Sequence, residues 1–136
     1  MADVAPGTAF DLIALPGGMP GAEHLRDCAA LTHLLKAQAA AGRYIAAVCA
    51  APVVVLVAHG LLTPAVSATC HPSFRDRLPN ATAADARVVV DGTFITSRGP
   101  GTSLEFALQC VASLAGKAAA EEVAAPMMLH AGVELK

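Results

Sequence analysis

The chain has 136 residues, of which 55% are hydrophobic and 4% aromatic, and its formal net charge is −2 at pH 7. This length is typical of one domain, and the dispersed Lys and Arg residues form no basic stripe that would bind nucleic acid. The longest apolar run, Ile45 to Ala58, is shorter than the about 20 residues of a membrane-spanning helix and contains Pro52. The N-terminus lacks the basic segment and apolar core of a secretory signal. We therefore expect a soluble, cytoplasmic protein without a membrane or nucleic-acid partner.

The four cysteines are far apart in the sequence and form no C-x-x-C pair. This spacing argues against a zinc knuckle or a disulfide framework and is typical of a reducing compartment. The cysteines are Cys28, Cys49, Cys70 and Cys110.

The N-terminal third predicts a strand, a helix and a second strand. Phe10–Gly18 (FDLIALPGG) is a short apolar run that ends in Pro-Gly-Gly, the pattern of a buried strand entering a tight loop. Asp27 is predicted to cap a helix that ends at Gly42, and Arg43–Val48 is predicted to be the second buried strand. Three leucines share one face of that helix: Leu31, Leu34 and Leu35.

The middle of the chain combines β-branched residues with helix end signals. Pro52 near the start and Gly60 just past the end predict a helix over Ala50–His59, although the valines alone favour a strand. We expect the next strand near Val66–Thr69 and a short helix directly after His71-Pro72.

The C-terminal third predicts a hairpin and two helices. Arg87–Asp91 and Thr93–Ser97 flank Asp91-Gly92, which is a two-residue hairpin signal. Thr102–Glu105 matches a capping box, and Lys117–Ala124 predicts a last helix. In the helix that follows the capping box, five side chains are expected to face the core: Leu104, Ala107, Leu108, Val111 and Leu114.

Alternating strands and helices predict an α/β fold with a mostly parallel sheet covered on both faces. Ligands of such sheets bind at the carboxyl ends of the strands. The Gly17-Gly18 loop, Cys49 and Cys70-His71 each follow a predicted strand, so we expect them to converge there.

A cysteine between a strand and a helix is placed for nucleophilic chemistry. The helix N-terminus favours the thiolate, which is the reactive form of a thiol. The N–H of Ala50 and one from the Gly17-Gly18 loop could hold a developing oxyanion, and His71 is a candidate base or proton shuttle.

Structural roles compete with these interpretations. A lone Cys in an apolar run, such as Cys49, is commonly a small core residue. Cys28 and Cys110 are expected on helix faces as packing residues, and a metal trio of Cys49, Cys70 and His71 lacks further spaced ligands. The remaining histidines are expected at the surface or at helix ends: His24, His33, His59 and His130.

Four motifs occur in order, DLIALPGGMPGAEHLRD, IAAVCAAP, TCHP and ITSRGPGTSLEFAL. At this spacing the chain resembles the ThiJ/PfpI family from about Phe10 to Met128, most of all its DJ-one branch of deglycases and glyoxalases. The resemblance implies a flavodoxin-like sheet, a homodimer, and no metal or organic cofactor. The class I glutamine amidotransferases share the strand-to-helix turn but have glycines around the cysteine where this chain has Ala and Pro.

Matching positions imply roles for individual residues. Cys49 corresponds to the nucleophilic, oxidation-sensitive cysteine, and His71 to the active-site histidine. Gly18 and Ala50 correspond to the backbone donors of the oxyanion pocket. Gly17 and the loop Gly99-Pro100-Gly101 correspond to the border of the pocket.

The chain also departs from the family pattern. Family members begin with a further strand-helix-strand segment, which carries a glutamate that hydrogen-bonds the cysteine. Met1 stands only about nine residues before the Phe10 strand, and Glu23 belongs to the family's own G-A-E pattern, so no replacement is evident. We expect the absent strand to lie beside the strand that leads to Cys49. A truncated gene product, a fragment of a longer protein and a half that needs its complement all fit this pattern.

Three functional hypotheses follow from the resemblance. The first is an enzyme that uses Cys49 and His71 to convert methylglyoxal-type dicarbonyls or early glycation adducts to 2-hydroxy acids during oxidative or carbonyl stress. The second is a redox-sensing or chaperone-like protein in which Cys49 is oxidised. The third is an inactive, N-terminally truncated member of the family.

Overall fold

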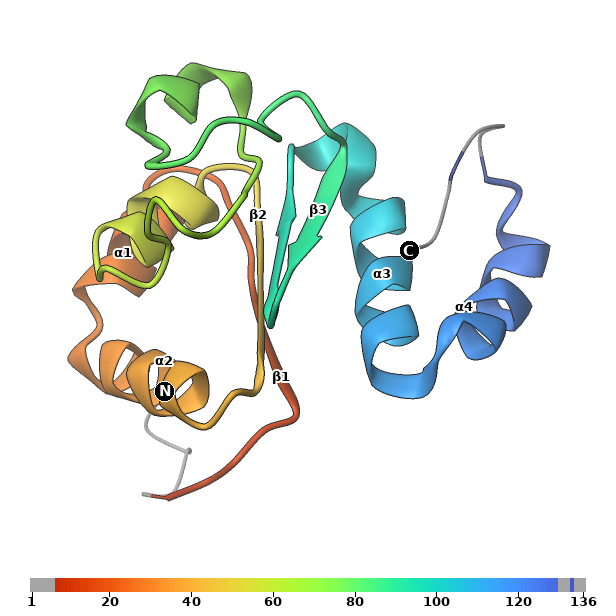
Figure 1. Ribbon diagram of the computed structural model, residues 1–136, viewed down its shortest axis with the longest axis horizontal. Helices are drawn as coiled ribbons and strands as arrows, with labels where there is room; N and C mark the ends of the chain where they lie inside the picture. Colours follow the sequence, from red (N-terminus) through yellow and green to blue (C-terminus); the bar gives the residue numbers. More distant parts are fainter. Residues whose placement is uncertain (1–6, 130–132, 134–136) are drawn as a thin grey trace.

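The computed structural model describes residues 7–129 and 133. Its centre is a four-stranded sheet with the strand order β1-β2-β4-β3 (Figure 1). β1, β2 and β4 are parallel, and β3 pairs antiparallel with β4. The strands are β1 Leu12–Leu15, β2 Tyr44–Val48, β3 Val88–Asp91 and β4 Phe94–Ser97.

Helices cover both faces of this sheet (Figure 1). One face carries α1 (Gly21–Asp27), α2 (Ala29–Ala40) and the π-helix Pro52–Val57, and the other carries α3 (Ser103–Ala115). α4 (Lys117–Ala124) packs against α3 on the side away from the sheet. Short 3-10 helices occur at Pro72–Arg77, Pro100–Thr102 and Ala125–Met127.

The residues of β2 alternate between two hydrophobic cores. Ile45 and Ala47 face the core beneath α2 and the π-helix, whereas Ala46 packs with Ile95 and with Phe106 of α3. All three β2 residues are fully buried, as expected for a central parallel strand with helices on both faces. The prediction of a mostly parallel sheet covered by helices is confirmed.

The predicted strand at Val66–Thr69 is wrong, because this segment has no regular secondary structure. β2 and β3 already pair with both edges of β4, so neither edge of β4 is open to this segment. Its backbone finds side-chain acceptors instead. The N–H of Thr69 donates to Oγ1 of Thr96 at 3.0 Å, and the N–H of Ser67 donates to Oδ2 of Asp91 at 2.7 Å.

The predicted N-cap at Asp27 is also wrong. Asp27 is the last residue of α1, a helix that the sequence did not indicate, and its carboxylate accepts hydrogen bonds from the adjacent Arg26. The helix after it begins at Ala29, and Cys28 is its N-cap without a side-chain hydrogen bond. On α2 the leucine face is confirmed, with Leu31 and Leu35 buried and Leu34 half-buried.

The start of α3 differs from the predicted capping box. The hydroxyl of Thr102 bonds back to Gly99 and Ser97, and Glu105 pairs with Arg87. The inward face of α3 is also different, because Phe106, Leu108 and Gln109 are the buried residues. Of the five residues predicted to point inward, Leu108 is buried and Val111 half-buried, while the others are exposed: Leu104, Ala107 and Leu114.

The predicted hairpin is confirmed as β3 and β4. Asp91 pairs with Phe94, so the two loop residues are Gly92 and Thr93, one position later than Asp91-Gly92. Gly92 has a φ of 56°, which glycine adopts without steric cost. The helix predicted over Ala50–His59 is present as the shorter π-helix Pro52–Val57.

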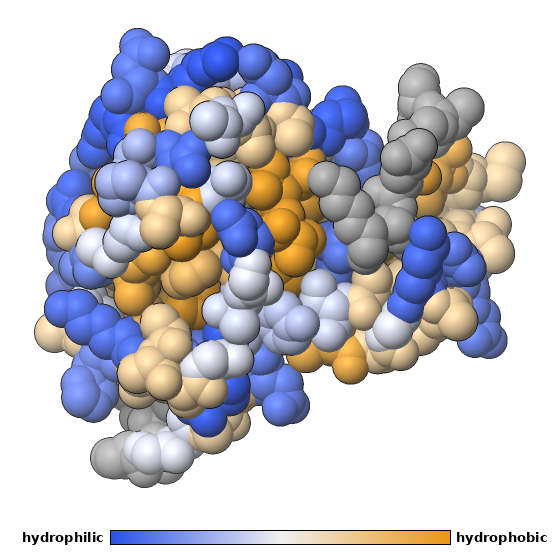
Figure 2. Space-filling view, viewed as in Figure 1, coloured by the Kyte–Doolittle hydropathy of each residue, from blue (hydrophilic) through white to orange (hydrophobic). Residues whose placement is uncertain are grey.

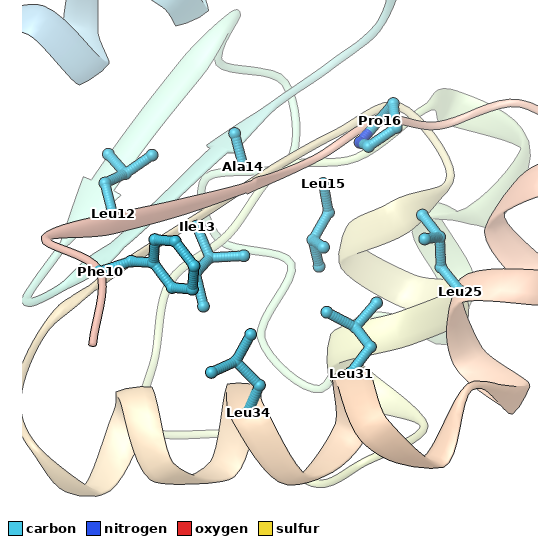
Figure 3. Close-up of a pocket in the computed structure, with 9 residues that line it drawn as sticks. All are labelled: Phe10, Leu12, Ile13, Ala14, Leu15, Pro16, Leu25, Leu31 and Leu34. Atoms are coloured by element: carbon cyan, nitrogen blue, oxygen red, sulfur yellow. The ribbon is translucent and has the colours of Figure 1, made fainter. Parts of the chain in front are cut away.

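The edge of the sheet at β1 is open. β2, which leads to Cys49, is paired on both sides, so the expectation of a vacant place beside it is wrong. Within the described residues no strand pairs with the outer edges of β1 and β3. Apolar side chains of β1, α1 and α2 line a groove of about 330 Å³ along the β1 edge (Figure 3). Apolar surface also gathers over the sheet, between the two helical layers (Figure 2).

No helix in the described part of the chain is long and apolar enough to span a membrane.

The buried side chain of Gln38 joins the starts of β1 and β2. Its Nε2 donates to the carbonyl oxygens of Phe10 at 2.7 Å and Tyr44 at 3.2 Å, and its Oε1 accepts from Nε of Arg43. We predict that Gln38→Met, which keeps the length but removes these bonds, lowers the free energy of unfolding by about 1–3 kcal/mol. Urea denaturation measures this, with the exposed Lys36→Met on the same helix as a near-neutral control. Equal midpoints for the two variants would contradict the prediction.

Candidate active site

Cys49 lies on a tight turn between β2 and the π-helix Pro52–Val57. Its φ is 65°, a left-handed conformation that costs a non-glycine residue about 1–2 kcal/mol. The N–H of Cys49 donates to the carbonyl oxygen of Ser97 at 2.9 Å, which ties the turn to the end of β4. The side chain is half-buried and belongs to none of the hydrophobic cores, so the alternative of a core cysteine is not supported.

The Gly17-Gly18 loop after β1 lies directly against this turn. A Cβ atom on Gly17 would lie 2.6 Å from Cβ of Cys49 and 2.8 Å from the carbonyl oxygen of Val48. Real Cβ atoms do not approach other atoms so closely, so position 17 has no room for a side chain. Gly18 follows with a φ of 83° and directs the chain into α1.

Two backbone N–H groups near Cys49 lack an acceptor. Within the described residues, the N–H groups of Ala50 and Gly18 donate no hydrogen bond. Ala50 is only 2% exposed, so water does not readily satisfy its N–H. The buried N–H of Ala50 and the exposed N–H of Gly18 are therefore available to an incoming oxygen atom, and their role as oxyanion donors stays a prediction.

His71 reaches the site through its backbone and its ring. Its N–H donates to the carbonyl oxygen of Cys49 at 2.9 Å. Nδ1 accepts the N–H of Ser73 at 3.3 Å, so the neutral ring carries its proton on Nε2. Cδ2 lies 3.7 Å from the position of a Cβ on Gly99. Within the described residues no hydrogen bond joins the thiol of Cys49 to the imidazole, so any proton transfer between them runs through a substrate or water.

Cys70 is a second thiol at the site but is buried, with 2% exposure. Its S–H donates to the carbonyl oxygen of His71 at 3.3 Å. Burial and, after it, the charge of Cys49 raise the pKa of Cys70 to about 11, whereas Arg75 and Arg98 act to lower it. Burial also raises the pKa of Cys110, on the inner side of α3, to about 11. Among the described residues no group of three or more His, Cys, Asp or Glu is arranged to hold a metal ion.

The loop after β4 is held by the hydroxyl of Thr102. This hydroxyl accepts the N–H of Gly99 at 3.1 Å and lies 2.6 Å from Oγ of Ser97. Gly99 thereby faces His71. Pro100 and Gly101 line a separate cavity of about 250 Å³, whose lining does not include Cys49.

The remaining candidates lie on α1, on α2, between these helices or after the π-helix. His24 and His33 are exposed. His59 ends the helical turn after the π-helix, where its Nε2 lies 2.9 Å from the carbonyl oxygen of Arg26. Cys28 lies between α1 and α2 rather than on a helix face. His130 lies outside the described residues.

Sequence reasoning missed three charged residues near the site, Arg75, Asp85 and Arg98. Nη1 of Arg75 lies 2.7 Å from Oδ1 of Asp85, and Nη2 of Arg98 lies 3.8 Å from the same oxygen. The available signals were the position of Arg98 at the end of a predicted strand and that of Arg75 in the short helix after His71.

These features define an α/β protein whose mostly parallel sheet presents a cysteine on a strand-to-helix turn. The model of the DJ-1/PfpI family matches residues 1–113, and the chain belongs to this family. Among similar proteins, Protein DJ-1 homolog B of Arabidopsis thaliana is 46% identical over 124 residues, which are 90% of this chain and 28% of that protein. Glutathione-independent glyoxalase DJR-1.2 of Caenorhabditis elegans is 40% identical over 88% of this chain and 63% of its own length.

Solved structures show the same similarity. The oxidised DJ-1 of Toxoplasma gondii superposes with a TM-score of 0.84 at 46% identity, covering 88% of this chain and 65% of that chain. DJ-1beta of Drosophila melanogaster superposes with a TM-score of 0.81 at 42% identity, covering 90% of this chain and 66% of that chain. The chain therefore spans about two thirds of these structures and less than a third of the Arabidopsis relative.

The contact between Gly17 and Cys49 can be tested by adding one methyl group. We predict that Gly17→Ala displaces the turn, lowers the free energy of unfolding by about 1–3 kcal/mol and slows alkylation of Cys49. Gly21→Ala is the matched control, because a Cβ there has no atom within 4 Å. Chemical denaturation and rates of iodoacetamide labelling measure both effects. Equal behaviour of the two variants would show that the two loops are not in contact.

The thiols should differ in reactivity. At pH 8 a pKa of about 11 leaves about a thousandth of Cys70 and Cys110 as thiolate. We predict that limited iodoacetamide labelling modifies Cys49 first, and that labelling of Cys70 and Cys110 rises as the pH approaches 11. Peptide mapping by mass spectrometry identifies the modified residue. Preferential labelling of Cys28 or Cys110 at pH 8 would contradict this order.

Proposed function

We propose that this chain uses Cys49 to convert methylglyoxal-type dicarbonyls, or their early adducts, to 2-hydroxy acids. The observation that carries the proposal is the half-buried Cys49 on its left-handed turn, with acceptor-free N–H groups of Gly18 and Ala50 on the two loops in contact there. In this interpretation the turn is a nucleophile elbow, which holds the thiol away from its own strand. Support also comes from the C. elegans relative, whose name is glutathione-independent glyoxalase.

The reaction begins with attack of the Cys49 thiolate on the aldehyde carbon. The new S–C bond pushes the carbonyl electron pair onto oxygen, where the N–H groups of Gly18 and Ala50 stabilise the oxyanion. Protonation of this oxygen yields a hemithioacetal. Nε2–H of His71 then donates its proton to the neighbouring ketone oxygen, and the freed nitrogen takes the proton from the hemithioacetal carbon.

The resulting enediol returns a proton to the neighbouring carbon and becomes a thioester of a 2-hydroxy acid. Water hydrolyses the thioester, which releases the acid and restores the thiol. The net change is the addition of one water molecule to the dicarbonyl, so the reaction needs no external oxidant or reductant.

A second candidate function is redox sensing or a chaperone-like role through oxidation of Cys49. The partial exposure of Cys49 favours this role, because Cys70 is buried and the raised pKa values of Cys70 and of the half-buried Cys110 leave little thiolate to oxidise. The similar structure from T. gondii is of an oxidised DJ-1. Turnover of a dicarbonyl distinguishes the enzyme from the sensor, and a cooperative unfolding transition distinguishes both from an inactive remnant.

The additional residues of the relatives are relevant to the turnover rate of the proposed reaction. We expect this chain alone to be a poorer catalyst, and a weaker homodimer, than a version that carries the family's strand-helix-strand segment. A glutamate contributed by that segment would hydrogen-bond the cysteine. The segment's first strand would pair with the outer edge of β1 or of β3. Because Gly17 follows β1 closely, support of β1 would also steady the turn of Cys49.

Conversion of methylglyoxal to lactate tests the proposed function. We predict that Cys49→Ser abolishes turnover and that His71→Ala lowers it by about 10²–10⁴-fold with little loss of thermal stability, because His71 is half-buried rather than in a core. Cys28→Ser is the control with unchanged turnover. The same assay on a version with the family's N-terminal segment should show a higher rate. Lactate formation by Cys49→Ser would exclude the mechanism, and parallel losses of stability and activity in His71→Ala would make His71 structural.

A further inference from the structure

Two arginines meet one aspartate next to the Cys49 turn. Arg98 follows Ser97, whose carbonyl oxygen accepts the N–H of Cys49. Arg75 lies in the 3-10 helix that begins after His71, whose own N–H donates to Cys49. Each backbone partner of Cys49, Ser97 and His71, is therefore followed within a few residues by an arginine. The guanidinium groups of both arginines lie close to Asp85.

The single carboxylate of Asp85 leaves this cluster with an excess of one positive charge. Arg75 makes a close pair with Asp85 at 2.7 Å. Arg98 is held weakly, because its Nη1 donates to the backbone carbonyl oxygen of Asp85 at 3.4 Å and its Nη2 lies 3.8 Å from Oδ1. Nε of Arg98 is a buried atom that has no hydrogen-bond partner within the part of the chain that the structure describes. Arg98 therefore has unused donor capacity beside the site.

The ion pair between Arg75 and Asp85 is also easily displaced by another anion. The side chain of Asp85 is 68% exposed and that of Arg75 is 46% exposed. Ion pairs as exposed as this one contribute little to stability. An incoming anion could therefore share or replace Asp85 at small cost.

The field of both arginines reaches the thiol of Cys70. Arg75 and Arg98 each act to lower the pKa of Cys70, against burial and the charge of Cys49, which raise it. Cys70 is the neighbour of His71, whose N–H bonds the backbone of Cys49. An anionic group near these arginines would thus lie close to the Cys49 turn.

We propose that Arg75 and Arg98 form an anion subsite beside Cys49, which selects carbonyl compounds that carry a carboxylate. The excess of one positive charge matches a single carboxylate better than a doubly charged phosphate. As a statement about substrates this inference rests on the proposed function, but the anion subsite itself does not require turnover.

Two alkylating reagents of nearly equal size test the subsite. Iodoacetate carries a carboxylate and iodoacetamide is its neutral counterpart, and each transfers its carbon to the Cys49 sulfur with loss of iodide. The ratio of the two rates at Cys49, measured by peptide mapping at one pH, cancels differences in thiolate content. We expect this ratio to exceed that of free N-acetylcysteine by about 3- to 30-fold at low salt, and to fall as salt is added.

Substitutions that remove a positive or a negative charge distinguish an electrostatic effect from a structural one. Arg75→Gln and Arg98→Gln should each lower the ratio about 3- to 10-fold, whereas Asp85→Asn should raise it, because it removes the negative charge that faces both guanidinium groups. Arg26→Gln, which removes the partner of Asp27, is the control with an unchanged ratio. Sodium acetate should also protect Cys49 from iodoacetamide at lower concentrations than inorganic phosphate does.

The outcomes decide between the two proposals. A ratio equal to that of N-acetylcysteine, or one that moves in the same direction for Asp85→Asn and Arg98→Gln, overturns the anion subsite. A Cys49 that reacts with neither reagent overturns it as well, and stronger protection by phosphate overturns the choice of a carboxylate. A raised, arginine-dependent ratio in a protein that forms no lactate upholds the subsite and overturns the proposed reaction alone.

Discussion

The close approach of Gly17 to Cys49 is the constraint on which the site depends. β1 and β2 are parallel neighbours, so the turns at their carboxyl ends emerge at the same edge of the sheet. These turns meet with no room for a Cβ between them. Two further backbone bonds, to Ser97 at the end of β4 and from His71, hold Cys49 from its other sides. Cys49 keeps its strained φ of 65° because these contacts leave it little alternative.

Environment, rather than residue type, separates the two thiols at the site. Cys70 is 2% exposed and its pKa is raised to about 11, chiefly by burial. Cys49, whose backbone carbonyl accepts the N–H of the residue after Cys70, is half-buried on a turn that faces acceptor-free N–H groups. One thiol is therefore suited to packing and the other to chemistry, although the reactive thiol lies in the more apolar stretch of sequence.

Local signals predicted the parts of the fold that local residues determine. Pro-Gly-Gly after β1, Asp91-Gly92 at the hairpin and Pro52 at the π-helix each act within a few residues. Tertiary contacts overrode such signals elsewhere. Val66–Thr69 has the composition of a strand, but β4 has no free edge for it. Glu105 pairs with Arg87 at 2.7 Å, and Thr102 makes no side-chain cap bond at the start of α3. Cys49 could be predicted from the end of β2, whereas His71 was expected at the end of a strand that does not form. Arg75 and Arg98 had only local signals, because their meeting depends on Asp85, which lies 10 and 13 residues away in the sequence.

The sequence of β1 is that of an interior strand, although β1 stands at an edge. Its residues Leu12 to Leu15 are apolar toward both faces of the sheet, the pattern of a parallel strand with neighbours on either side. At the edge this leaves Ala14 exposed and an apolar groove beside the strand (Figure 3). Pro16 lines that groove, and the next residue is Gly17, which touches Cys49. One short, continuous segment, from β1 to Gly17, thus connects the edge of the sheet to the thiol. We therefore expect that covering the β1 edge influences the position of Cys49 through Pro16 and Gly17.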